Sequence, residues 1–157
     1  MKLSQAFRLS RSPCLALVGA GGKTTALFQL ARELSSMVSG QSSVVVTATT
    51  HLGAWQLPLA DRHIAAERPV DLAMLESGIP PGVTLVTGPR KGDRTTGISP
   101  EIQKWLHAFC QKQSLPLLIE ADGARQKPLK APADHEPPIP PFVETVVVVA
   151  GLSALGK

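Results

Sequence analysis

The chain has 157 residues, of which 43% are hydrophobic and 18% charged, and it carries a net charge of +4. These values are those of one globular domain with a core of its own, and they exclude a disordered, collagen-like or coiled-coil chain. Aromatic residues make up only 4%, and no long run of basic residues is interleaved with them, so the composition predicts no nucleic-acid partner.

The first half of the chain predicts alternating strands and helices. Residues 14–18 form a short apolar run that ends at a glycine, which is typical of a buried strand. Residues 24–38 carry apolar side chains at the spacing of helical turns, which predicts a helix with one buried face. The β-branched stretch at residues 43–49 predicts a second strand. Three shorter elements follow: an edge strand at residues 62–66, a helix at residues 71–77 and a strand at residues 84–87.

The second half continues this alternation. Residues 99–112 predict a helix, because Ser99 can cap it, Pro100 fits its first turn and Glu101 complements its positive end. Apolar strands are predicted at residues 115–120 and 145–150. The pattern indicates an α/β fold of the P-loop-like, three-layer type, in which helices cover both faces of a mostly parallel sheet. We expect one domain over residues 1–157.

Two stretches predict loops. Residues 89–96 are charged and contain glycine, and residues 122–141 hold six prolines in twenty residues. A long loop inside a compact domain is usually functional. We therefore expect the 122–141 loop to hold polar groups for a ligand or partner, the alternative being a solvent-facing connection.

A glycine-rich loop lies between the first predicted strand and the first predicted helix. Glycines let the backbone approach an anion, and the amides at a helix N-terminus favour negative charge. Lys23 would reach the β- and γ-phosphates of ATP or GTP, and the Thr24 hydroxyl would ligate Mg²⁺. The residues predicted to bind nucleotide are Gly19, Ala20, Gly21, Gly22, Lys23, Thr24 and Thr25.

The spacing of this loop differs from the usual one. The standard motif has a glycine six positions before the lysine, where this chain has Leu17. The loop resembles the shortened GxxGK[ST] loop of Mur-ligase-type ATPases. The alternative is a glycine-rich turn with a solvated lysine, which the strand before it and the helix after it make less favourable.

Acidic residues follow the strand predicted at residues 115–120. Glu120 and Asp122 stand at its carboxyl end, and either could hold Mg²⁺ directly or through water. The sequence does not decide between them. With Thr24 they make up the predicted metal site, and Lys23 and Asp122 are predicted to act in catalysis.

The second predicted strand ends in Thr49, Thr50 and His51. In an open α/β sheet, ligands bind outside the carboxyl ends of the strands, so these side chains should face the same crevice as the glycine-rich loop. His51 is a candidate acid, base or phosphate-orienting group. A structural role for this histidine is an equal alternative.

Four segments together resemble the YqeC family: VGAGGKTT, TATTHL, LLIEADGARQKPLKAPADHEPPIP and VVVVAGLSALGK. The resemblance covers residues 14–157, and the segment from EADGAR to the prolines is its most specific part. It implies an α/β nucleotide-binding accessory protein that matures the cofactor of selenium-dependent molybdenum hydroxylases. It also marks further motif positions without settled roles: Gly123, Lys130, His135 and Glu136.

The family's members continue beyond the GLSALGK segment, so the chain is a short member, a fragment or a truncated product. Three functions remain open. The first is a Mg²⁺-dependent NTPase whose 122–141 loop contacts a molybdenum hydroxylase or its cofactor intermediate. The second is a non-catalytic module that carries an anionic cofactor, and the third is an ATP-dependent ligase, for which the chain is short.

The cysteines and the apolar runs suggest a location. Cys14 and Cys110 lack a CxxC spacing, which predicts reduced thiols and no disulfide or structural zinc. No apolar run approaches the roughly 18 residues that cross a bilayer. We therefore expect a cytoplasmic protein without a membrane partner.

Overall fold

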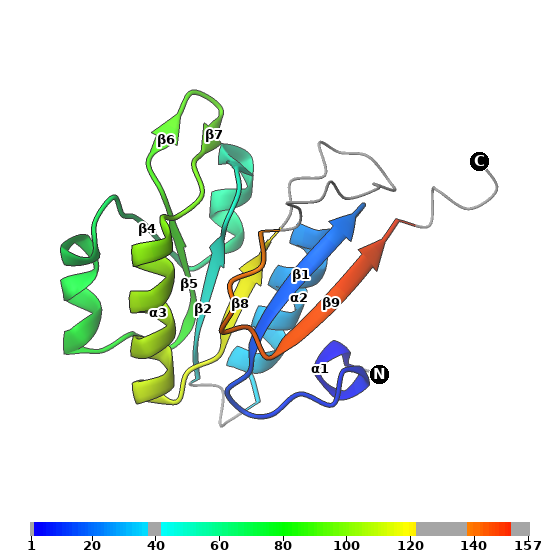
Figure 1. Ribbon diagram of the computed structural model, residues 1–157. Helices are drawn as coiled ribbons and strands as arrows, with labels where there is room; N and C mark the ends of the chain where they lie inside the picture. The colour runs from blue at the N-terminus through cyan, green and yellow to red at the C-terminus, as the bar shows by residue number, and fades with distance from the viewer. Residues whose placement is uncertain (1, 38–41, 122–137, 152–157) are drawn as a thin grey trace.

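A computed structural model describes residues 2–37, 42–121 and 138–151 of the protein. Its centre is a sheet of six strands in the order β4-β5-β2-β8-β1-β9 (Figure 1). Every neighbouring pair in this sheet is parallel. The strands are β1 (Cys14–Ala20), β2 (Ser43–Ala48), β4 (Arg62–Ala65), β5 (Gly82–Thr87), β8 (Leu117–Glu120) and β9 (Thr145–Ala150).

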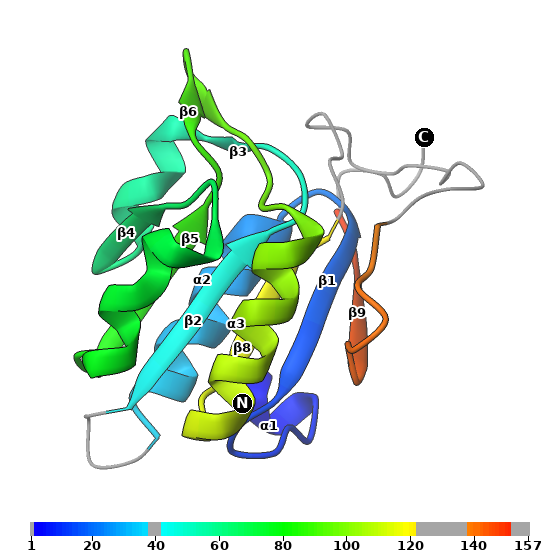
Figure 2. The same cartoon turned by 60° about the vertical axis from the view of Figure 1, so that its left-hand side comes forward.

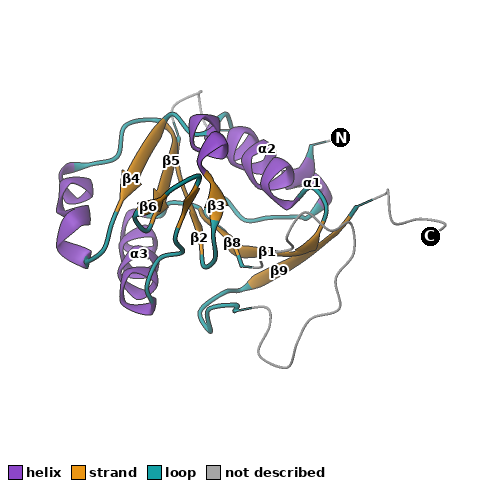
Figure 3. Ribbon diagram, turned by 90° about the horizontal axis from the view of Figure 1, so that it is seen from above, coloured by secondary structure: helices purple, strands orange, loops and turns teal. Residues whose placement is uncertain are grey.

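Helices cover both faces of the sheet. Figure 3 shows α1 (Leu3–Ala6) and α2 (Lys23–Ser35) on one face and α3 (Pro100–Gln113) on the other. Alternate residues of β1 enter two separate apolar layers, with Leu15 and Leu17 packed in the α2 layer and Ala16 in the α3 layer. The predicted three-layer α/β fold with a mostly parallel sheet is confirmed.

The structure corrects the prediction for residues 89–96, which form a hairpin. Its strands are β6 (Arg90–Lys91) and β7 (Arg94–Thr95), joined by a turn in which Gly92 has φ +63°. Strand β3 (Leu52–Gly53) pairs with β7 to make a small antiparallel sheet. In Figure 2 the hairpin projects past the carboxyl ends of the large sheet.

The short helical segments also differ from the prediction. The helix expected at residues 71–77 is a 3₁₀ helix, η2 (Pro69–Ser77), and a second 3₁₀ helix, η1 (Ala54–Leu59), was not predicted. At the start of η2, Asp71 accepts hydrogen bonds from the amides of Glu67 and Arg68. Such brief segments lack the length that an apolar periodicity needs to show itself.

No helix among the described residues is long and apolar enough to cross a membrane.

Both cysteines are free and buried where β1 meets α3. Burial raises the pKa of Cys14 to about 11 and that of Cys110 to about 12. A thiol with a pKa near 11 is ionised in only about one molecule in a thousand at pH 8, and the thiolate is the reactive form.

We expect iodoacetamide at pH 8 to leave both thiols of the folded chain unmodified for an hour and to modify both in 8 M urea. Mass spectrometry reads the result, and labelling of the folded chain within minutes at pH 8 would contradict the burial.

Candidate functional site

The glycine-rich loop joins the end of β1 to the start of α2. Gly19, Gly21 and Gly22 all have positive φ values, of 96°, 75° and 97°, which side chains rarely adopt. Gly22 is the N-cap of α2, and no side chain caps this helix end. The first amides of this thirteen-residue helix therefore lie at the carboxyl edge of the sheet without a side-chain cap.

Gly19 has a second constraint. A Cβ atom built on it would lie 2.3 Å from the carbonyl oxygen of Val149 on the neighbouring strand β9. The glycine is thus required both by its backbone angle and by the close approach of β9. The sheet therefore constrains the first glycine of the loop.

Lys23 is buried at this loop. Its side chain is 5% exposed, and its Nζ donates a hydrogen bond of 2.7 Å to the carbonyl oxygen of Gly19. The ammonium group therefore folds back over the glycines and does not extend into solvent. A buried charge is costly unless it is hydrogen-bonded, so its position here calls for a partner in the loop or a bound anion.

The acidic strand lies directly beside the loop strand. Strand β8 pairs with β1 on one side and β2 on the other, with Glu120 in register with Leu17 and Ala48. The Thr24 hydroxyl donates a 2.8 Å hydrogen bond to Glu120 Oε2, and Glu120 is 7% exposed. The structure therefore brings the predicted Thr24 and Glu120 together, 96 residues apart in sequence.

These oxygens suit a hard cation. Mg²⁺ is usually held by one or two carboxylates, with water and substrate phosphates completing its shell. Among the described residues, no group of three or more Asp, Glu, His or Cys side chains gathers at one place. The Thr24 hydroxyl and the Glu120 carboxylate are the described groups of the predicted metal site that lie in contact.

Asp122, the other predicted metal ligand and catalytic residue, lies outside the described residues. So do Gly123, Lys130, His135 and Glu136. Of the predicted 122–141 loop, the structure describes residues 138–141.

The structure places His51 against the hairpin. His51 Nδ1 lies 3.0 Å from the carbonyl oxygen of Thr95 on β7, and because a carbonyl only accepts, Nδ1 carries the proton. Nε2 is then an acceptor in the neutral ring. No hydrogen bond joins His51 to the glycine-rich loop or to Glu120 among the side-chain bonds of the described residues.

The two threonines before His51 lie near β8 and the hairpin. The Thr49 amide donates a 3.0 Å hydrogen bond to the carbonyl oxygen of Glu120, so Thr49 does lie at the predicted edge. The hydroxyls of Thr50 and Thr95 are buried and have no hydrogen-bond partner in the described part of the chain. Thr95 was missed by the sequence analysis, although the Gly-Asp pair before Arg94 is a hairpin signal.

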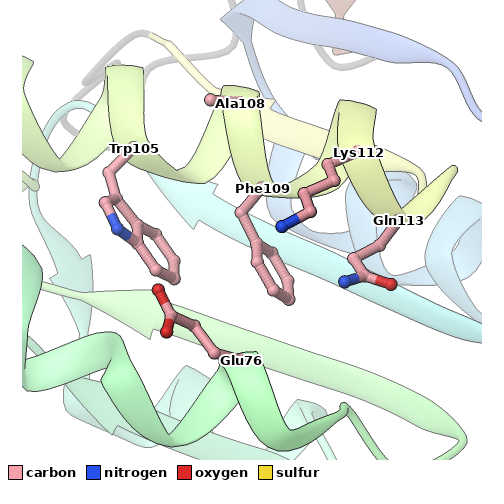
Figure 4. A pocket seen from close by; sticks show the side chains of 6 residues that line it. All are labelled: Glu76, Trp105, Ala108, Phe109, Lys112 and Gln113. Atoms are coloured by element: carbon pink, nitrogen blue, oxygen red, sulfur yellow. The ribbon is translucent and has the colours of Figure 1, made fainter.

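The described part of the chain also has cavities that the glycine-rich loop does not line. One of about 390 Å³ runs between η2 and the C-terminal half of α3, lined by Glu76, Trp105, Ala108, Phe109, Lys112 and Gln113 (Figure 4). Trp105 and Phe109 stack there with ring centroids 5.1 Å apart. None of the residues that line this groove belongs to the glycine-rich loop.

The contact between Thr24 and Glu120 can be tested by a double-mutant cycle. We expect Thr24→Val and Glu120→Gln each to lower the free energy of unfolding by about 1–3 kcal/mol, because each removes a partner of a part-buried hydrogen bond. The double variant should cost about 1 kcal/mol less than the sum. Urea denaturation measures all four chains. The control pairs Thr24→Val with Glu101→Gln on α3, and the losses of unfolding free energy of these two variants should add. If the losses of Thr24→Val and Glu120→Gln also add, the hydrogen bond between Thr24 and Glu120 contributes nothing to stability.

Fold and loop together define an α/β protein whose glycine-rich turn opens onto the carboxyl edge of a parallel sheet, beside a buried carboxylate. The chain belongs to the YqeC family, described as "YqeC protein", which matches residues 15–157. The "Uncharacterized protein YqeC" of Escherichia coli (strain K12) is 36% identical over 150 residues, covering 93% of this chain and 54% of the relative. The chain therefore spans about half the length of that relative. No solved structure matches it.

Proposed function

We propose that the protein binds ATP or GTP with Mg²⁺ on the loop from Gly19 to Thr25. The observation that carries this proposal is the 2.8 Å hydrogen bond between the Thr24 hydroxyl and Glu120, on the same loop as the buried Lys23. A hydroxyl at a helix N-terminus, a lysine and a carboxylate on the adjacent strand are the groups that hold a nucleotide phosphate and its metal.

Each residue has a role that its position suits. The amides at the start of α2 bind phosphate oxygens, and Lys23 Nζ exchanges the Gly19 carbonyl oxygen for a phosphate oxygen. The Thr24 hydroxyl and Glu120, with Asp122, would hold the metal directly or through water. When bound, Mg²⁺ supplies charge neutralisation on the phosphates.

We further propose that this binding serves the maturation of a molybdenum hydroxylase cofactor, with NTP hydrolysis as the chemical step. Support comes from membership in the YqeC family and from the resemblance of its acidic and proline-rich segment. The partner in this proposal is a molybdenum hydroxylase, or its selenium-dependent cofactor intermediate, at the 122–141 loop.

A non-catalytic carrier is a second candidate, and one observation favours it. Within the described residues, the imidazole of His51 is hydrogen-bonded to the hairpin through Thr95, and no side-chain hydrogen bond joins it to the loop. On that view the same amides and Lys23 hold a phosphate group of a cofactor and deliver it without hydrolysis. Phosphate release in the presence of the target hydroxylase separates the two functions, and its loss in Asp122→Asn would favour the enzyme.

Metal removal tests the binding proposal. We expect calorimetric titration of Mg-ATP or Mg-GTP into the full chain to give one site, and excess EDTA to weaken binding about tenfold or more, because the metal bridges the phosphates to Thr24 and Glu120. Titration with adenosine or guanosine, which lack phosphates, is the control and should give no heat of binding. Equal affinity with and without Mg²⁺ would remove the role given to Thr24 and Glu120.

A further inference from the structure

The outer strand of the sheet leaves apolar side chains in solvent. Strand β9 pairs with β1 on one side and is the edge strand of the sheet on the other. Val147 and Val149 pack in the α2 layer. On the opposite face, Val146 is 44% exposed and Val148 is 73% exposed, which corrects the prediction of a strand buried on both faces.

The exposed face continues the α3 layer of the core. Val146 and Val148 are in register with Ala16 and Val18 of β1, which are buried in that layer. Figure 3 shows α3 over the far half of this face, toward β2 and β5, with β9 at the opposite end of the sheet. Among the described residues, α3 covers β8 and β2 and leaves Val146 and Val148 of β9 exposed.

Such a face is costly for a protein alone in water. The strands of parallel sheets are normally covered on both faces, and a solvent-facing strand would alternate apolar with polar residues. Strand β9 reads Thr-Val-Val-Val-Val-Ala and carries no charge, proline or bulge to protect its open edge. This composition is typical of a strand that is covered on both faces and paired along both edges.

We propose that β9 is a docking edge for additional polypeptide of the kind that makes the E. coli relative nearly twice as long. This chain covers 54% of that relative, so the relative has ample residues for one more strand and a helix. The strand pairs with the open edge of β9, and the apolar face of the helix lies over Val146 and Val148. A second copy of the chain fits less well, because pairing two β9 edges adds a strand but leaves both valines uncovered.

The test combines the full chain with the part of the E. coli relative that lies outside the matched region. That part is first added as a separate polypeptide. If it does not fold alone, it is fused to the chain through a flexible Gly/Ser linker. We expect hydrogen exchange of the β9 amides to slow about tenfold or more relative to the chain by itself. Val148→Lys should reverse the protection without unfolding the chain, since Val148 is 73% exposed.

Val70→Lys is the matched control. Val70 is 63% exposed on η2, so the substitution introduces the same charge at a similar exposure. This variant should leave the protection of the β9 amides unchanged. Three results would overturn the proposal. The first is no added protection of the β9 amides in either format, and the second is an equal loss of protection with Val70→Lys. The third is protection of the β9 amides in the chain alone, together with a dimer in sedimentation experiments.

Discussion

Replacing Lys23 by methionine is expected to weaken binding of Mg-ATP or Mg-GTP about 100-fold or more, because it removes charge-assisted hydrogen bonds to phosphate worth about 3 kcal/mol in total. The same substitution should leave the free energy of unfolding nearly unchanged. Lys23 is only 5% exposed, and in the part of the chain that the structure describes its side chain is hydrogen-bonded to the Gly19 carbonyl. Loss of that hydrogen bond lowers the free energy of unfolding, but removal of a buried charge raises it, so the two effects offset each other.

The two readouts together separate a ligand-binding lysine from a structural one. Calorimetric titration gives the affinity, and urea denaturation gives the stability. Lys104→Met, at an exposed position of α3, is the matched control and should change neither quantity. Unchanged affinity in Lys23→Met, or a loss of stability as large as the loss of binding energy, would show that Lys23 serves the fold.

Gly19→Ala is expected to lower the free energy of unfolding by about 2–5 kcal/mol. Part of this cost, about 1–2 kcal/mol, comes from the left-handed backbone at φ +96°. The rest comes from a Cβ placed 2.3 Å from the Val149 carbonyl oxygen, which forces β9 away from β1.

Gly22→Ala separates these two causes. Gly22 has nearly the same angle, φ +97°, but a Cβ there meets nothing within 4 Å. Its substitution should therefore cost only the backbone part, about 1–2 kcal/mol. Urea denaturation of both variants measures the difference, and equal costs would mean that the contact with Val149 is not what requires a glycine at position 19.

Much of the fold could be predicted from local sequence. The glycine-rich turn between residues 14–18 and 24–38, and the capped helix that starts at Ser99, are patterns that neighbouring residues determine. The hairpin at residues 90–95 and the 3₁₀ helix η1 were missed because each is too short for a hydrophobic period, and the helix expected at residues 71–77 was found as the 3₁₀ helix η2. The exposure of Val146 and Val148 was missed because the run of four valines has the composition of a strand that is covered on both faces.

The site could be predicted in part. The juxtaposition of Thr24 and Glu120 follows from a general rule, since the carboxyl ends of parallel strands share one edge of the sheet. The order of strands, with β8 between β1 and β2, is set by tertiary packing and left no local signal. The partner of His51 lies 44 residues further along, on a hairpin that had not been predicted.

The most direct test is a crystal structure of the chain with Mg²⁺ and a non-hydrolysable ATP or GTP analogue. We expect the β- and γ-phosphates on the amides of residues 19–25, Lys23 Nζ on a phosphate oxygen, and the metal between the Thr24 hydroxyl and the carboxyl edge of β8. Nucleotide bound elsewhere, with the Thr24–Glu120 hydrogen bond intact and Lys23 still on the Gly19 carbonyl, would contradict it.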